Sequence, residues 1–140
     1  MVDFKVVVND VKTGKSYPIP VTGHHANSLI GKKLGDEVDG IFVSLPGYKL
    51  QIVGGTDKDG FPMKKGVPGQ GRRRLLLSRT VGYKPKERGK RMKKSIRGST
   101  IGQDIVQINM KVIKEGAKPI DTIITVEKKP EEEKKPEEKK

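Results

Sequence analysis

The chain has 140 residues, of which 34% are charged and 32% hydrophobic, and its formal net charge is +13. This length allows one domain with a modest core and is too short for two domains of ordinary size. The absence of cysteine excludes disulfides, thiolate metal sites and cysteine nucleophiles. No stretch approaches the roughly 20 apolar residues that a membrane span requires, and the first residues lack the pattern of a signal peptide. We therefore expect a soluble, cytoplasmic protein.

The expected strands and helix can be located from hydrophobic periodicity and turn residues. Alternation of apolar and polar side chains is typical of half-buried strands. The strands that we expect lie at residues 2–8, 17–21, 40–45, 48–53, 105–113 and 120–126. The one good helix candidate is 26–34, with Asn27 or Ser28 as its N-cap and Gly35 at its end. Leu75–Leu77 is expected to be a short buried run.

These elements predict a mainly β fold, namely a small β-barrel with one short helix, a basic extension and a disordered C-terminal tail. Seventeen glycines and nine prolines favour many turns and short strands, and closure into a barrel would remove exposed sheet edges. We assign residues 1–126 to one barrel-type domain, and residues 127–140 to the tail. The tail contains only Glu, Lys and Pro, so it cannot offset the entropy of ordering.

The positive charge is concentrated in residues 61–100. This segment holds fourteen Lys and Arg residues and one acid, Glu87, whereas the rest of the chain holds sixteen of each sign. A block of one sign stores repulsion that opposes folding, so a polyanion that neutralises it is the best explanation, and we favour nucleic acid. An acidic protein, an anionic membrane and simple solubility are the alternatives. Membrane binding ranks low because residues 82–98 have almost no apolar side chains to insert.

The fourteen bases are the candidate RNA-binding residues. They are Lys64, Lys65, Arg72, Arg73, Arg74, Arg79, Lys84, Lys86, Arg88, Lys90, Arg91, Lys93, Lys94 and Arg97. Bases spaced through glycine-rich chain fit contacts to the phosphates and shape of a folded RNA. DNA is less favoured because no long helix is available for a major groove, and the aromatic motifs of single-strand readers are absent. Residues 79–100 show no apolar periodicity, so we expect them to project as a basic arm.

A glycine-rich segment has part of the pattern of a nucleotide-binding loop. Residues 66–71 have the glycine spacing of a P-loop. That loop requires a lysine and a hydroxyl immediately afterwards, and Arg72 and Arg73 occupy those positions. The better interpretation is that the glycines let this backbone approach another backbone closely.

Two further patterns are reminiscent of metal sites. Asp57–Gly60 begins like a calcium loop, but Gly55 and Gly66 stand where its first and twelfth carboxylates are required. We therefore predict a tight turn at this position.

His24 and His25 are adjacent and lack partner ligands. No serine has a credible base, and no carboxylate pair lies in a segment that resembles a cleft. We predict that the protein is not an enzyme and has no catalytic residue, metal, cofactor, membrane partner or small-molecule substrate.

A family resemblance goes further than these patterns. Gly54–Val67 closely resembles the signature segment of archaeal and eukaryotic small-subunit ribosomal protein six, the S-six-e family. Gly71–Ser78 and the basic stretch from Arg88 to Gly98 are similar to the same family, and the likeness extends over roughly residues 1–125. The resemblance implies a β-barrel protein embedded in small-subunit ribosomal RNA beside other ribosomal proteins, with a role in assembly and scaffolding of the cytoplasmic ribosome.

One departure from the family concerns the C-terminus. Eukaryotic members continue into a long basic helix with regulatory serines, whereas this chain has a neutral tail without serine. We therefore expect the archaeal form, without the phosphorylation switch. The alternative functions that we consider are a free RNA- or DNA-binding regulator or chromatin protein, and an RNA-processing enzyme.

Overall fold

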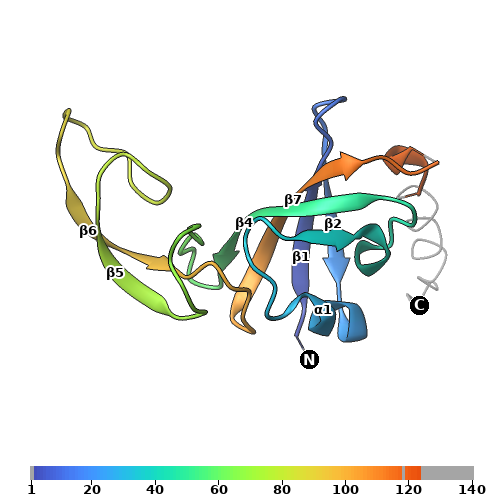
Figure 1. Ribbon diagram of the computed structural model, residues 1–140, viewed down its shortest axis with the longest axis horizontal. Helices are drawn as coiled ribbons and strands as arrows, with labels where there is room; N and C mark the ends of the chain where they lie inside the picture. Colours follow the sequence, from blue (N-terminus) through green and yellow to red (C-terminus); the bar gives the residue numbers. More distant parts are fainter. Residues whose placement is uncertain (1, 118, 124–140) are drawn as a thin grey trace, which may run out of the picture.

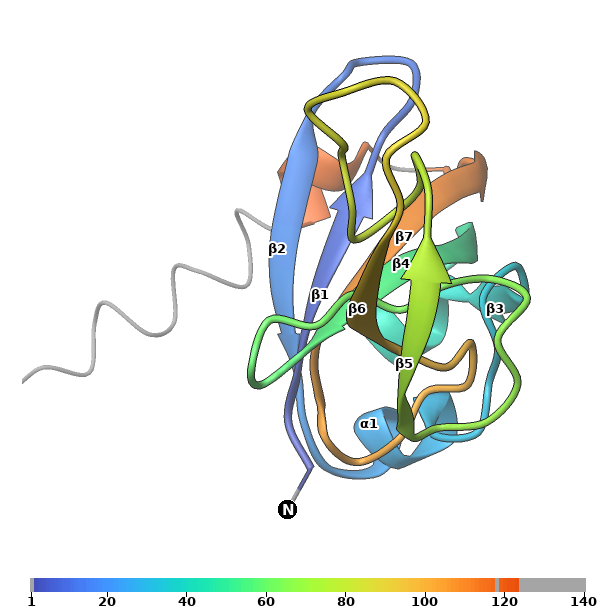
Figure 2. The ribbon, with the colours of Figure 1, turned by 90° about the vertical axis from the view of Figure 1, so that its left-hand side faces the viewer.

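The computed structural model describes residues 2–117 and 119–123, which form one five-stranded sheet and one two-stranded ribbon (Figure 1). The elements in chain order are β1 (Phe4–Asn9), β2 (Ser16–Val21), α1 (Gly23–Leu29), β3 (Glu37–Asp39), the 3-10 helix η1 (Gly40–Val43), β4 (Lys49–Asp57), β5 (Arg72–Leu77), β6 (Met92–Arg97) and β7 (Ile105–Lys114). Strands β5 and β6 stand apart from the larger sheet at one end of the molecule (Figures 1 and 2). The mainly β prediction is confirmed.

The five-stranded sheet has the order β2-β1-β7-β4-β3. The β1–β7 pair is parallel, and the other neighbours are antiparallel. Alternate side chains of the strands, among them Val6, Ile108 and Ile52, point into one core and are almost completely buried. The core is completed by Leu29 of α1 and Val43 of η1. The alternation that predicted β1, β4 and β7 therefore reflects burial of one face of the sheet.

Closure of this sheet into a barrel is not found among the described residues. The hydrogen-bonded order ends at β2 on one side and at β3 on the other, and η1 contacts β2 without a strand ladder. Pro18 and Pro20 lie in β2 and have no backbone N–H to donate, which suits a strand at an edge. Closure of the barrel stays a prediction.

Two predicted elements have different positions or types. Helix α1 begins and ends earlier than the predicted 26–34. Gly31 has a left-handed φ of 87°, which a continuing helix would not allow, so the helix ends before it. Residues 40–45 are not a strand, because Gly40–Val43 forms a 3-10 turn. A Cβ at Gly40 would lie 2.1 Å from the carbonyl oxygen of Leu45. This close approach requires glycine and lets the turn fold back on itself.

The C-terminal prediction is partly wrong and partly outside the described residues. Residues 120–123 form one helical turn in place of the predicted strand, and Ile120 is buried in the core. Residues 124–126 and the predicted tail, 127–140, lie outside the described residues. Among the described residues, no helix is long and apolar enough to cross a membrane.

The predicted basic arm contains a strand. Residues 92–97 form β6 and pair with β5 along their whole length. Ile96 and Leu77 are buried with Val67 in a second, small core. The leucine run in β5 is not buried throughout, since Leu76 is 54% exposed. Burial in β6 does not alternate, because its two buried residues are the neighbours Ile96 and Arg97, so the sequence carries no hydrophobic period that would predict this strand.

The hairpin predicts different local stability for β6 and the loop before it. In the free protein, β6 amides that bond to β5 should exchange slowly, and backbone order parameters should approach about 0.85. Residues 84–91 should exchange faster and show lower order parameters, because they lie outside the ladder. NMR relaxation and amide exchange would test this, with β7 as the internal reference. Equal mobility across residues 84–97 would contradict the hairpin.

Candidate nucleic-acid interface

The register of the ribbon separates its positive charges. Residues directly opposite each other share a face of an antiparallel pair, and like charges there are destabilising. Each exposed base near the middle of the ribbon faces an uncharged partner. These pairs are Arg73↔Ile96, Arg74↔Ser95, Leu75↔Lys94 and Leu76↔Lys93. The ribbon can therefore form with little repulsion between directly opposed side chains.

One register pair is an exception, because Arg72 lies directly opposite Arg97. The carboxylate of Asp57, at the end of β4, joins both guanidinium groups. Its Oδ2 accepts hydrogen bonds from Nε of Arg72 and from Nη1 of Arg97, each at 2.6 Å. The Asp57 side chain is completely buried. A residue of the large sheet thus offsets the one opposed like-charge pair of the ribbon and attaches the ribbon to that sheet.

Arg97 uses all three guanidinium nitrogens within the protein. Besides Asp57, it donates to Oδ2 of Asp104 at 3.0 Å and to the carbonyl oxygen of Gln70 at 3.0 Å. Its side chain is 5% exposed. Arg97 was a candidate RNA contact, and the structure places it in the interior with its donors already occupied.

Arg72 also uses part of its guanidinium group for contacts within the protein. It also pairs with Asp59, and its guanidinium carbon lies 4.9 Å from the centroid of the Phe61 ring, within the range of a cation–π contact. Its side chain remains 37% exposed. We refer to Asp57, Asp59, Arg72, Arg97 and Asp104 as the Asp57 cluster.

The pKa of Asp57 reflects these contacts. Burial of the carboxyl raises its pKa, but hydrogen bonds from Arg97, Arg72 and the Lys58 amide outweigh that effect and hold the pKa below the ordinary 3.8. Asp57 is therefore ionised at neutral pH. The predicted tight turn at residues 57–60 is confirmed, since the Gly60 amide donates to the Asp57 carbonyl at 2.9 Å and Gly60 has a φ of 82°. This turn places Asp59 beside Arg72.

The glycine-rich segment 66–71 approaches another backbone closely, and that backbone belongs to the protein itself. The amide of Ser99 donates to the carbonyl of Val67 at 2.7 Å, and the amide of Thr100 to that of Gly69 at 3.2 Å. A Cβ at Gly98 would lie 1.9 Å from the Gly69 carbonyl oxygen. The glycines thus allow the segment to pack against the chain that follows β6.

Most candidate residues are exposed and lie outside the Asp57 cluster. The eleven exposed candidates outside this cluster are Lys65, Arg73, Arg74, Arg79, Lys84, Lys86, Arg88, Lys90, Arg91, Lys93 and Lys94. Lys64 is half-buried. All of the eleven except Lys65 lie on the ribbon or in the loop between its strands. The structure therefore gathers ten exposed bases on one projecting part of the molecule.

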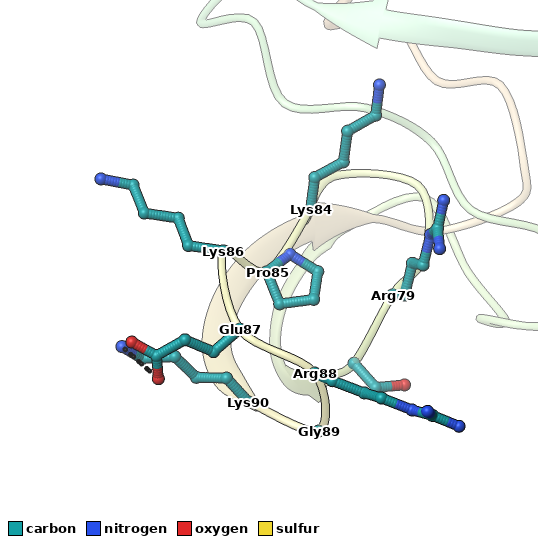
Figure 3. A pocket seen from close by; sticks show the side chains of 9 residues that line it. Arg79, Lys84, Pro85, Lys86, Glu87, Arg88, Gly89 and Lys90 are labelled. Atoms are coloured by element: carbon teal, nitrogen blue, oxygen red, sulfur yellow. Dashed lines mark ion pairs between the residues drawn. The ribbon is translucent and has the colours of Figure 1, made fainter.

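The loop between β5 and β6 folds around a basic hollow of about 820 Å³. Arg79, Lys84, Lys86 and Arg88 line it, and Figure 3 shows their charged ends fanning outward from the loop. The acid of this loop, Glu87, lies 3.7 Å from Lys90. With one acid among many bases, the loop can bind an anionic surface at several points.

A small β protein that concentrates its exposed cations on one ribbon and loop has the electrostatic surface of a nucleic-acid-binding protein. Residues 4–125 match the model of the family described as Ribosomal protein S6e. The chain belongs to this family.

Archaeal relatives agree with this assignment. A protein of Methanocella arvoryzae named "Small ribosomal subunit protein eS6" is 52% identical over 131 residues, which cover 94% of this chain and 92% of that protein. Proteins of the same name from Archaeoglobus fulgidus and Methanothermobacter thermautotrophicus are 52% and 51% identical, over 86% of this chain and 95% and 94% of theirs. The resemblance found in Gly54–Val67 is confirmed.

Removal of the Asp57 charge should destabilise the protein at neutral pH. Asp57→Asn keeps the shape of the side chain but leaves Arg72 and Arg97 opposed, and loss of one partner from a buried ion pair costs about 3 kcal/mol or more. Asp59→Asn is the matched control, because Asp59 is half exposed and should cost about 1 kcal/mol or less. Urea unfolding at pH 7 measures both. Equal effects of the two variants would contradict the central role of Asp57.

The Asp57 carboxyl also predicts that the stability of the protein depends on pH. Because the pKa of folded Asp57 lies below its ordinary 3.8, its contribution is fully present above about pH 4 and is lost as the pH falls through the folded value. The stability difference between the unaltered chain and Asp57→Asn should therefore be constant from pH 5 to 7 and shrink below about pH 4. Urea unfolding curves of both proteins across this pH range test the prediction. A stability difference that grows on acidification would contradict it.

Proposed function

We propose that this chain is a structural constituent of the small ribosomal subunit and that it binds small-subunit ribosomal RNA through the β5–β6 ribbon and its loop. Membership of the S6e family supports the ribosomal role, as do the names of the archaeal relatives. The family is one of ribosomal proteins, so the function is structural and not enzymatic. Location in cytoplasmic ribosomes and support of subunit assembly and translation follow from the same proposal.

The observation that carries the RNA-binding proposal is the separation of charge in the fold. Ten exposed bases occupy the ribbon and its loop, whereas the chain outside residues 61–100 is neutral overall. RNA phosphates neutralise such a surface and release counterions on binding. Arg97 is left out of the proposed contacts, and Arg72 is assigned mainly to the Asp57 cluster.

The five-stranded sheet supports the ribbon in this proposal. The core of the sheet holds most of the buried hydrophobic residues. The Asp57 cluster attaches the base of the ribbon to the end of β4. Outside residues 61–100 the chain carries equal numbers of bases and acids, and we assign the surface of the sheet to contacts with neighbouring ribosomal proteins. The alternative of a free RNA- or DNA-binding regulator shares the basic surface but receives no support from the family.

Sedimentation distinguishes the ribosomal component from the free regulator. When the tagged chain is expressed in an archaeal host and the extract is fractionated on a sucrose gradient, we expect nearly all of it to co-sediment with small subunits. This association should survive moderate salt, as for an integral component. A large free pool at the top of the gradient would support the regulator and contradict our proposal.

RNA affinity should fall steeply with salt. If about eight exposed bases meet phosphates, the plot of log affinity against log salt should have a slope of roughly −6 to −7. The triple substitution Lys84→Gln, Lys86→Gln and Arg88→Gln in the loop should make this slope shallower by about 2 to 3. Filter binding to small-subunit ribosomal RNA at several salt concentrations measures it.

A matched control removes the same charge from the large sheet. Lys49, Lys111 and Lys114 are exposed and lie on β4 and β7. Their substitution by Gln should leave the slope nearly unchanged. Equal effects of the two triple variants would show that net charge, and not the ribbon and loop, determines binding.

A further inference from the structure

The bases of the ribbon project from both of its faces. In a pleated strand, neighbouring side chains point to opposite sides. The β5–β6 register places Arg74 and Lys93 on one face, and Arg73 and Lys94 on the other. All four are exposed, and none forms a salt bridge within the described part of the chain. These four exposed cations are therefore divided evenly between two opposite surfaces.

The first face is open. Besides Arg74 and Lys93, it carries Leu76, which is 54% exposed. The Asp57 cluster occupies the base of this face, because Arg72 and Arg97 share it. Beyond that base, the face presents two cations around an uncovered apolar side chain.

The second face is covered in part. Leu77 and Ile96 pack there against Val67, and Tyr83 closes over them from the loop. The Gly82 backbone also lies against Ile96, since a Cβ built on Gly82 would come within 3.2 Å of its side chain. Arg73 and Lys94 remain exposed on this face beside the covering segments. The protein thus fills the middle of the second face and leaves its cations accessible.

We propose that the ribbon lies between two separate segments of RNA and binds the phosphates of one segment with each face. This inference rests on the proposed RNA-binding function and adds to it the arrangement of the partner. A ribbon lying flat on one RNA helix would leave the cations of its far face without phosphates. It could not enter a single A-form helix either, because the major groove is too narrow and deep. Two backbones, one on each side, neutralise both pairs.

The support of the ribbon fits this position. Asp57 joins β5 and β6 to the end of β4 through both arginines, and backbone hydrogen bonds from residues 98–100 fasten the segment before β5. The ribbon is therefore held at its base and projects beyond one end of the large sheet, as Figure 1 shows.

Paired substitutions test each face separately. Arg74→Gln with Lys93→Gln removes the cations of the first face, and Arg73→Gln with Lys94→Gln removes those of the second. Each double variant should make the salt slope for small-subunit ribosomal RNA shallower by about 1.4 to 1.8, as expected for two lost phosphate contacts. Lys111→Gln with Lys114→Gln is the matched control and should change it little. A slope equal to the control for either ribbon variant would overturn binding by both faces.

Crosslinking then identifies what each face touches. The chain has no cysteine, so Leu76→Cys on the first face and Met92→Cys on the second introduce unique attachment sites for a short photo-crosslinker. Both positions are exposed, at 54% and 43%, and urea unfolding checks that each variant is folded. Primer extension should map the two crosslinks to RNA segments that are separate in the secondary structure. Crosslinks to the same nucleotides would overturn the inference.

These outcomes separate the inference from the proposed function. If the unaltered chain binds ribosomal RNA no better than an unrelated RNA of equal length, the RNA-binding function itself fails. If the chain binds ribosomal RNA specifically but the double variant of one face leaves the salt slope unchanged, only the two-sided arrangement fails.

Discussion

The position of the β5–β6 ribbon depends on one buried carboxylate. Asp57 ends β4 of the large sheet and accepts hydrogen bonds from Arg72 and Arg97, which are directly opposed in the ribbon. Without an anion between them, two guanidinium groups at this spacing would repel, and burial would make the repulsion stronger. The same carboxylate therefore makes the base of the ribbon stable and determines where the ribbon leaves the sheet. Bases that are candidates for RNA contact and bases that hold the protein together lie side by side in β5.

This division explains why the candidate site could be predicted only in part. The charge imbalance of residues 61–100 correctly located the basic surface, because net charge in a segment is independent of fold. It could not show that Arg97 is buried, since its partner Asp57 is distant in sequence and lies in a segment predicted only as a turn, and nothing in the sequence links Arg97 to Asp104. The local signal was the position of Arg97 next to the apolar Ile96, and the nearby lysines obscured it.

The fold could be predicted where one face of a strand meets a large core. Strands β1, β4 and β7 show the expected alternation because their apolar residues are buried in the main core. Prediction failed where backbone geometry determined the structure. The 3-10 turn at Gly40 depends on a close approach to Leu45, and β6 depends on pairing with β5. Neither interaction leaves a hydrophobic period in the sequence.

The place of β7 in the large sheet has a consequence for the order in which the chain can fold. β7 is the last strand among the described residues, yet it lies between β1 and β4 and pairs with both. Until residues 105–114 have left the synthesising ribosome, β2–β1 and β4–β3 are two hairpins with no strand to join them. The ribbon, residues 72–97, is thus synthesised before the sheet that supports it can be completed. Its cations emerge into a cell rich in RNA while their own scaffold is still unfinished.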